Sequence, residues 1–166
     1  MHNKGKTVRV RARWSWTGVS ATLAAAVCGA MAPAATPSLS GPIPARVIEV
    51  VDGDTLVVEA RIWIDHVVTT RVRLSGVDAP ELNGACPAER VAARAARDYL
   101  GARLADGAPD GPLGAEVVLH EVRWGKYAGR VLARVTTAAG TDLAAALLSA
   151  GHARPYAGGR RAGWCG

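Results

Sequence analysis

One long helix pattern set among five strand patterns limits the folds open to this chain more than any other feature. The strand patterns are rich in β-branched residues and partly alternate apolar with charged side chains, which is typical of half-buried strands. The helix pattern starts at Pro87, since proline suits the first helical position and Glu89 suits the first turn, and it runs to about Leu104. Its expected apolar stripe consists of Ala92, Ala95, Ala96, Tyr99, Leu100 and Leu104. The strand patterns cover residues 45–51, 55–64, 69–74, 117–122 and 131–137.

The order of these elements predicts a small closed β-barrel with helices. The long helix separates the third strand from the fourth. A second, short helix over 143–150 follows Asp142, a typical N-cap, and ends at Gly151. Five strands in this order fit an α+β fold built on a barrel of the OB type. We expect this domain to cover 45–157 and a Gly- and Arg-rich tail to cover 158–166.

The first 35 residues have the order of a secretory signal peptide. Five basic residues and no acidic ones occupy the first 13 positions, an Ala-rich apolar stretch follows to residue 35, and small residues at its end offer cleavage sites. An uncleaved membrane anchor is the alternative, although the stretch is short and mostly alanine. We expect a secreted or periplasmic protein without stable membrane association after cleavage, and a Pro/Ser spacer over 36–44.

The leader also accounts for most of the positive charge. The whole chain has 20 basic and 14 acidic residues, which gives a net charge of +6. Without the five leader bases, 15 basic residues face 14 acidic ones and the net charge is +1. The basic composition is therefore no evidence for nucleic-acid binding, which has to be argued from local geometry.

Two cysteines, Cys86 and Cys165, remain once the leader is removed. In an oxidising compartment an isolated pair favours a disulfide, which would tie the tail to the start of the long helix. Two free thiols are the alternative. Zinc binding is not expected, because no histidine or further cysteine lies at the spacing of zinc ligands.

Two short acidic motifs carry the chemistry that the sequence suggests. Asp52-Gly53-Asp54-Thr55 lies between the first two strand patterns, and Asp78-Ala79-Pro80-Glu81 follows the third. Each motif alone is more often a turn than a metal site. A hairpin turn and a neighbouring strand end can nevertheless bring Asp54 and Asp78 to one site. Two carboxylates, a backbone carbonyl and waters there would suit Ca²⁺.

Two arginines lie close to these motifs in the sequence. Arg73 is on the third strand pattern, before Asp78, and Arg130 begins the last strand after a turn that contains glycine. In isolation, each is more often a surface residue or half of an ion pair. Arginine is also the side chain that makes forked contacts with phosphate oxygens. Together with the carboxylates, the arginines indicate phosphodiester chemistry.

Four segments, taken in order, resemble thermonucleases, the staphylococcal-nuclease-like family of OB-fold nucleases. The segments are Val-Asp-Gly-Asp-Thr (51–55), Arg-Leu-Ser-Gly-Val-Asp-Ala-Pro-Glu (73–81), Lys-Tyr-Ala-Gly-Arg-Val-Leu-Ala (126–133) and Gly-His-Ala-Arg-Pro-Tyr (151–156). The resemblance extends from about residue 45 to residue 156. It implies a barrel that cleaves nucleic acid with the help of calcium.

The residue roles of that family carry over by position. The residues that resemble its calcium ligands are Asp54, Asp78 and, through its carbonyl, Ala79, with Asp52 and Thr55 in support. Glu81 matches the carboxylate that activates the attacking water, and Arg73 and Arg130 match the arginines that clamp the scissile phosphate. The residues that match nucleotide contacts are Lys126, Tyr127 and Tyr156.

The chain departs from the family pattern near Arg130. The turn before it contains Ala128-Gly129, one residue more than the shortest family version, and Gly125 stands where an aspartate commonly precedes the lysine. Longer relatives have a further helix after Tyr156, and the Cys86–Cys165 link is expected to take its place. None of these differences removes a catalytic side chain.

The sequence therefore predicts an exported, calcium-dependent nuclease that cuts DNA, with RNA as a second substrate, and has little sequence specificity. We expect it to be a monomer, and the resemblance implies products with 3′-phosphate ends. The alternative from another class is a non-catalytic OB barrel that binds nucleic acid or a protein. A third hypothesis is an envelope-anchored structural domain with a vestigial site.

Overall fold

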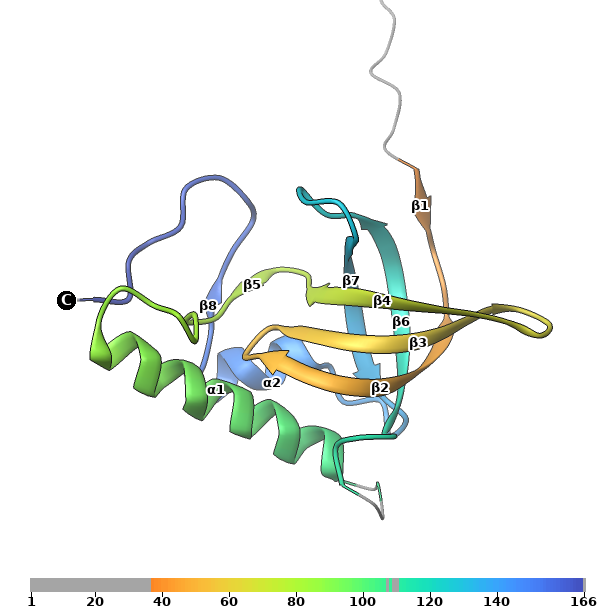
Figure 1. Cartoon of the computed structure of the whole chain (residues 1–166), viewed down its shortest axis with the longest axis horizontal. Helices are drawn as coiled ribbons and strands as arrows, with labels where there is room; N and C mark the ends of the chain where they lie inside the picture. The colour runs from red at the N-terminus through yellow and green to blue at the C-terminus, as the bar shows by residue number, and fades with distance from the viewer. Residues whose placement is uncertain (1–36, 107, 109–110, 166) are drawn as a thin grey trace, which may run out of the picture. The chain divides into compact units, whose positions relative to one another are not determined.

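The computed structural model describes residues 37–106, 108 and 111–165 (Figure 1). The expected signal peptide and its alternative, the membrane anchor, fall outside these residues. Within the described part of the chain, no helix is both long enough and apolar enough to cross a membrane.

Five strands close into a barrel, as the sequence predicts (Figure 1). β2 pairs with β3 and β3 with β4, both antiparallel, and β4 then runs parallel to β7. The sheet closes from β7 through β6 back to β2. This is the strand order of an OB-fold barrel. The strands span Ile43–Asp52 (β2), Thr55–Trp63 (β3), His66–Leu74 (β4), Glu116–Trp124 (β6) and Arg130–Thr137 (β7).

Three two-residue strands lie outside the barrel pattern. β1 (Ser38–Leu39) adds to the edge of β6, so the segment expected to be a spacer contributes a strand. β5 (Val77–Asp78) pairs with β8 (Arg154–Pro155) in a separate small sheet. Two residues are too few to show any alternation, so nothing in their sequence predicts these strands. The β5–β8 pair holds the start of the C-terminal tail beside β5 (Figure 1).

The long helix α1 (Pro87–Ala105) contributes one face to the core. The predicted stripe is wrong at Ala95, which is exposed, and at Ala92, which is only half-buried, whereas Ala93 is fully buried. Alanines occur on several faces of this helix, so the apolar pattern leaves its orientation open and packing against the barrel decides it. The buried residues of α1 are Glu89, Ala93, Ala96, Leu100 and Leu104.

The short helix α2 (Leu143–Ser149) begins as predicted. The Asp142 side chain accepts a hydrogen bond from the Ala145 backbone N–H at 3.0 Å and so caps the first turn. α2 and α1 share an aliphatic core with the barrel strands. The largest fully buried side chains of this core include Leu56, Leu74, Leu100, Leu119, Leu143 and Leu147. The loops that carry the acidic motifs are thereby anchored at strand ends that one core holds in place.

Candidate active site

Close packing between the β2–β3 turn and α1 brings the two acidic motifs together. A Cβ atom on Gly53 would lie 2.6 Å from the Cβ of Ala96 and 2.9 Å from the Cβ of Ala79. Only glycine therefore lets the turn approach both the helix and the segment after β5. Asp54, the next residue, is consequently held beside Asp78.

Asp54, Arg73 and Asp78 form a buried ion-pair network. Their exposed fractions are 1%, 6% and 5%, respectively. The Arg73 guanidinium donates from Nη1 to Asp54 Oδ1 at 2.8 Å, and its Nη2 lies 2.6 Å from Asp54 Oδ2 and 3.0 Å from Asp78 Oδ1. One positively charged nitrogen thus contacts an oxygen of each aspartate. Carboxylate oxygens that converge in this way are arranged to hold a cation.

Further hydrogen bonds fix the Asp54 carboxylate. The Ala79 backbone N–H donates to Oδ2 at 3.1 Å, and the Thr55 hydroxyl donates to Oδ1 at 2.9 Å. The Asp52 side chain accepts the Asp54 backbone N–H at 3.1 Å and so braces the turn. Burial raises the pKa of Asp54 to about 7, although Arg73 opposes this rise and Asp52 adds to it. An additional cation at this carboxylate would favour its ionised form.

Glu81 lies in the loop after β5, with 42% of its side chain exposed. The buried carboxylate of Glu89 braces this loop, because it accepts the backbone N–H of Glu81 at 3.5 Å and that of Ala85 at 3.0 Å. Gly84 makes room for this brace, since a Cβ at that position would overlap the Glu89 side chain. In the sequence, Glu89 is recognisable only as a residue suited to the first turn of a helix, and no local pattern indicates its second role.

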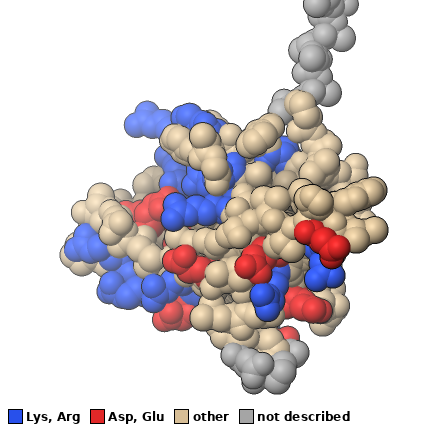
Figure 2. Space-filling model, turned by 45° about the vertical axis from the view of Figure 1, so that its right-hand side comes forward, with Lys and Arg blue, Asp and Glu red and all other residues tan. Residues whose placement is uncertain are grey.

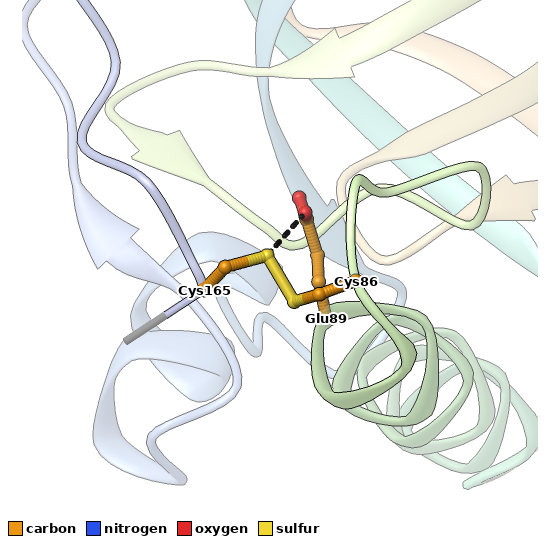
Figure 3. A group of neighbouring side chains, drawn as sticks. All are labelled: Cys86, Glu89 and Cys165. Carbon is orange, nitrogen blue, oxygen red and sulfur yellow. Dashed lines mark hydrogen bonds between the residues drawn. A yellow bond between two sulfur atoms is a disulfide. The ribbon is translucent and has the colours of Figure 1, made fainter.

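A disulfide lies against the same brace (Figure 3). Cys86 and Cys165 are joined with an S–S distance of 2.07 Å, which confirms the predicted pairing. The Sγ of Cys165 lies 3.6 Å from Oε2 of Glu89. A disulfide sulfur carries no proton, so this is a close contact and not a hydrogen bond. Since cysteine ligates metals as the thiolate, the two cysteines and Glu89 form no metal site while the disulfide is intact.

A second guanidinium enters the site from the C-terminal tail. Arg161 Nε lies 2.6 Å from Asp78 Oδ1, and Nη1 donates to Glu81 Oε1. Burial alone would lower the pKa of Arg161, but the hydrogen bond to Glu81 and the charge of Asp78 raise that pKa above its ordinary value. Arg161 is not among the site residues expected from the sequence. The sequence shows only that it belongs to a short Arg-rich tail with a cysteine near its end.

An open cleft of about 740 Å³ adjoins the ion-pair network through Asp52 and Thr55. Tyr127 and Arg130, from the β6–β7 loop and the start of β7, also line it. So does Arg71, whose side chain the alternation of β4 places on the same face as Arg73. The structure thus brings two parts of the chain that are distant in sequence to one cleft beside the carboxylates. One part is β2 to β4, and the other is the β6–β7 loop with the start of β7.

Arg130 lines this cleft. One of its donors, Nε, is buried and has no hydrogen-bond partner among the described residues. A guanidinium at the wall of a cleft is suited to contact an anion. The Arg130 guanidinium lies 5.1 Å, and Lys126 Nζ 5.6 Å, from the centre of the Tyr127 ring. Both cations are within the range of cation–π attraction and gather at one loop.

Gly125 explains one departure from the family pattern. Its N–H donates to the Arg130 carbonyl at 3.0 Å, which closes the loop between β6 and β7. A Cβ on Gly125 would lie 2.6 Å from the same carbonyl oxygen. The aspartate that is common at this position therefore does not fit this loop conformation.

Tyr156 is positioned by the tail. Its hydroxyl donates to the Gly159 carbonyl at 2.8 Å, and its backbone N–H donates to the Gly76 carbonyl at 2.9 Å. Neither Tyr156 nor Lys126 is among the described residues that line the cleft.

Basic and acidic side chains lie next to one another on the face of the molecule shown in Figure 2. This mixture agrees with the small net charge of residues 36–166. The cations of the cleft that could contact a polyanion are Arg71 and Arg130.

The comparison with known families agrees with this geometry. A family model described as staphylococcal nuclease homologue matches residues 71–162, more than half of the chain. The matched region contains Arg73, Asp78, Glu81 and Arg130, whereas Asp54 precedes it. A comparison with curated proteins finds no match. The closed barrel, the buried network and the family match together show that the chain belongs to the staphylococcal nuclease homologues, a family of nuclease-like hydrolases.

Proposed function

We propose that this protein is an exported, calcium-dependent nuclease that hydrolyses phosphodiester bonds of DNA, with RNA as a second substrate. One observation carries the proposal. Asp54 and Asp78 converge on Arg73, Arg161 joins Asp78 to Glu81, and Arg130 lines the open cleft beside this network. Acids that can hold a cation and activate water lie beside cations that can hold a phosphate.

The donor set fits a hard divalent cation. Asp54 Oδ2 and Asp78 Oδ1 already converge on one charged nitrogen of Arg73, at 2.6 and 3.0 Å. Calcium prefers such oxygen ligands in a flexible arrangement. The residues that would hold it are Asp54, Asp78 and, through its carbonyl, Ala79, supported by Asp52 and Thr55. A bound calcium ion would supply positive charge that polarises the phosphate.

The side chains of the chain itself carry the remaining roles. Glu81 is partly exposed and would accept a proton from the attacking water. Arg73 and Arg130 would stabilise the charge that builds on the phosphate oxygens, and such contacts are each worth several kcal/mol. Arg73 contacts Asp54 and Asp78 through Nη1 and Nη2, so a contact with phosphate would use another of its N–H donors or displace one of the aspartates.

The cleft supports weak sequence specificity. Its described lining offers one aromatic side chain, Tyr127, for stacking on a base. The cations of the cleft, Arg71 and Arg130, suit the phosphate backbone and carry no sequence information. The proposed 3′-phosphate products rest on the family resemblance, and export rests on the leader in the sequence.

The test is degradation of DNA by the purified protein with calcium and with calcium chelated. Arg130→Ala should abolish most of the cutting, because the cleft loses a guanidinium proposed to hold the phosphate. Arg46→Ala is the matched control, since Arg46 is exposed, pairs only with Glu59 among the described residues and lies outside the cleft. Mass spectrometry of the fragments would show whether the phosphate stays on the 3′ end. Tight DNA binding without any cutting would instead support the non-catalytic binding barrel.

A further inference from the structure

The C-terminal tail places a cation on the carboxylates of the site. Arg161 contacts both Asp78 and Glu81, the residues proposed to bind calcium and to activate water. Asp78 Oδ1 is shared, since Arg161 Nε approaches it to 2.6 Å and Arg73 Nη2 to 3.0 Å. A cation that binds this oxygen has to displace at least one of the two guanidinium groups.

The segment from β8 to Cys165, which contains the tail, is held at both of its ends. β8 pairs with β5, where Asp78 lies opposite Arg154, and Cys165 is bonded to Cys86 at the start of α1. Contacts within this segment add to the constraint. The Arg154 guanidinium lies 3.8 Å from the centre of the Trp164 ring and donates to the Gly163 carbonyl at 2.9 Å. Arg161 therefore returns to Asp78 at a high effective concentration.

The neighbouring residue provides a natural comparison. Arg160 is exposed and forms none of the ion pairs found among the described residues. Two adjacent arginines thus carry the same charge on the same tail, but only Arg161 contacts the carboxylates. Replacing each arginine in turn therefore distinguishes two effects. An effect of direct contact would be lost only with Arg161, whereas a general attraction between the tail and the acidic site would weaken equally with either arginine.

We propose that Arg161 is a built-in counterion of the acidic site, held there by the disulfide-linked tail, and that it sets the calcium concentration that the site requires. Arg161 competes with calcium for Asp78 and Glu81. The inference rests on the proposed function, because it concerns the calcium site of that nuclease. It adds a determinant of metal affinity that lies outside the sequence motifs of the catalytic site.

The test is calcium binding measured by isothermal titration calorimetry on the oxidised full-length protein. Arg161→Gln should bind calcium roughly tenfold more tightly than the wild type, the order of effect that Coulomb's law gives for removing one charge beside a divalent ion in a water-like medium. Arg160→Gln, which loses the same charge without losing a contact, should stay within about twofold of the wild type at physiological salt. Equal affinities for Arg161→Gln and the wild type would overturn the proposal.

Two further measurements test the parts of this proposal separately. Asp54→Ala should lose calcium binding, and if neither it nor the wild type binds calcium, both this inference and the calcium-dependent function fail. If calcium binds through Asp54 but Arg161→Gln has no effect, only this inference fails. Reduction of the Cys86–Cys165 disulfide should shift the wild-type affinity toward that of Arg161→Gln. An affinity that does not change on reduction would overturn the role of the disulfide.

Discussion

Replacement of Arg73 by methionine should lower the free energy of unfolding of the protein, and calcium should restore part of that loss. Arg73 makes three short contacts with Asp54 and Asp78, at 2.6, 2.8 and 3.0 Å, and all three side chains are almost fully buried. Methionine keeps much of the volume of the side chain but removes its charge. Both aspartates then remain buried near one another without their main counterion.

The magnitude follows from this burial. Removing one partner of a buried ion pair costs about 3–5 kcal/mol, because an uncompensated charge remains in the interior. In chelator, the free energy of unfolding of Arg73→Met should fall by that amount. Calcium at about one hundred times its dissociation constant should restore about 2.7 kcal/mol, since it binds the folded state only. The variant should bind calcium at least as tightly as the wild type, because the competing guanidinium is gone.

The assay is urea unfolding of the full-length protein, followed by circular dichroism in chelator and in calcium. Arg46→Met is the matched control, because Arg46 pairs with Glu59 at 2.9 Å on the surface, with 60% of its side chain exposed. The loss of its ion pair should cost less than about 1 kcal/mol in chelator, and calcium should stabilise this control as it stabilises the wild type. A free energy of unfolding of Arg73→Met that is the same in chelator and in calcium would refute the cation site at Asp54 and Asp78.

Three more predictions follow from the site and its supports. Glu81→Gln should lower kcat by about 10²- to 10⁴-fold in assays at saturating calcium, and an unchanged kcat would remove Glu81 as the base. Gly125→Ala should weaken DNA binding measured by fluorescence anisotropy, because its Cβ would lie 2.6 Å from the Arg130 carbonyl oxygen and would displace the loop that holds Arg130. Binding as tight as that of the wild type would show that the loop relaxes at no cost. The double change Cys86→Ser and Cys165→Ser should lower the free energy of unfolding by about 4 kcal/mol in urea titrations, and equal midpoints would contradict this.

Much of the fold could be predicted from local sequence signals. Alternation in strands and the cap at Asp142 depend on neighbouring residues, so the five barrel strands and the starts of both helices are readable along the chain. The closed barrel follows from the order of these elements. The buried face of α1 was predicted less well, because Ala92, Ala93 and Ala95 are chemically alike and only contact with the barrel distinguishes them.

The sequence predicted which residues belong to the candidate site, but not how they are arranged in space. The motifs and the family resemblance indicated Asp54, Arg73, Asp78, Glu81 and Arg130. The burial of Arg73 between two aspartates depends on residues from the β2–β3 turn and from β5, which the sequence does not show to be in contact. The unpaired Nε of Arg130 likewise depends on how the closed β6–β7 loop packs.

The sequence by itself determined the elements, the cysteine pair and the chemical types present, because propensity, periodicity and side-chain chemistry are properties of short segments. Only the tertiary structure decided which charges share a site. It joined Arg161 to Asp78 and Glu81, and it placed Glu89 beneath the Glu81 loop. The physical reason is that ion pairs act over a few ångströms, whereas these partners lie far apart along the chain and meet only when the core, the β5–β8 pair and the disulfide are formed.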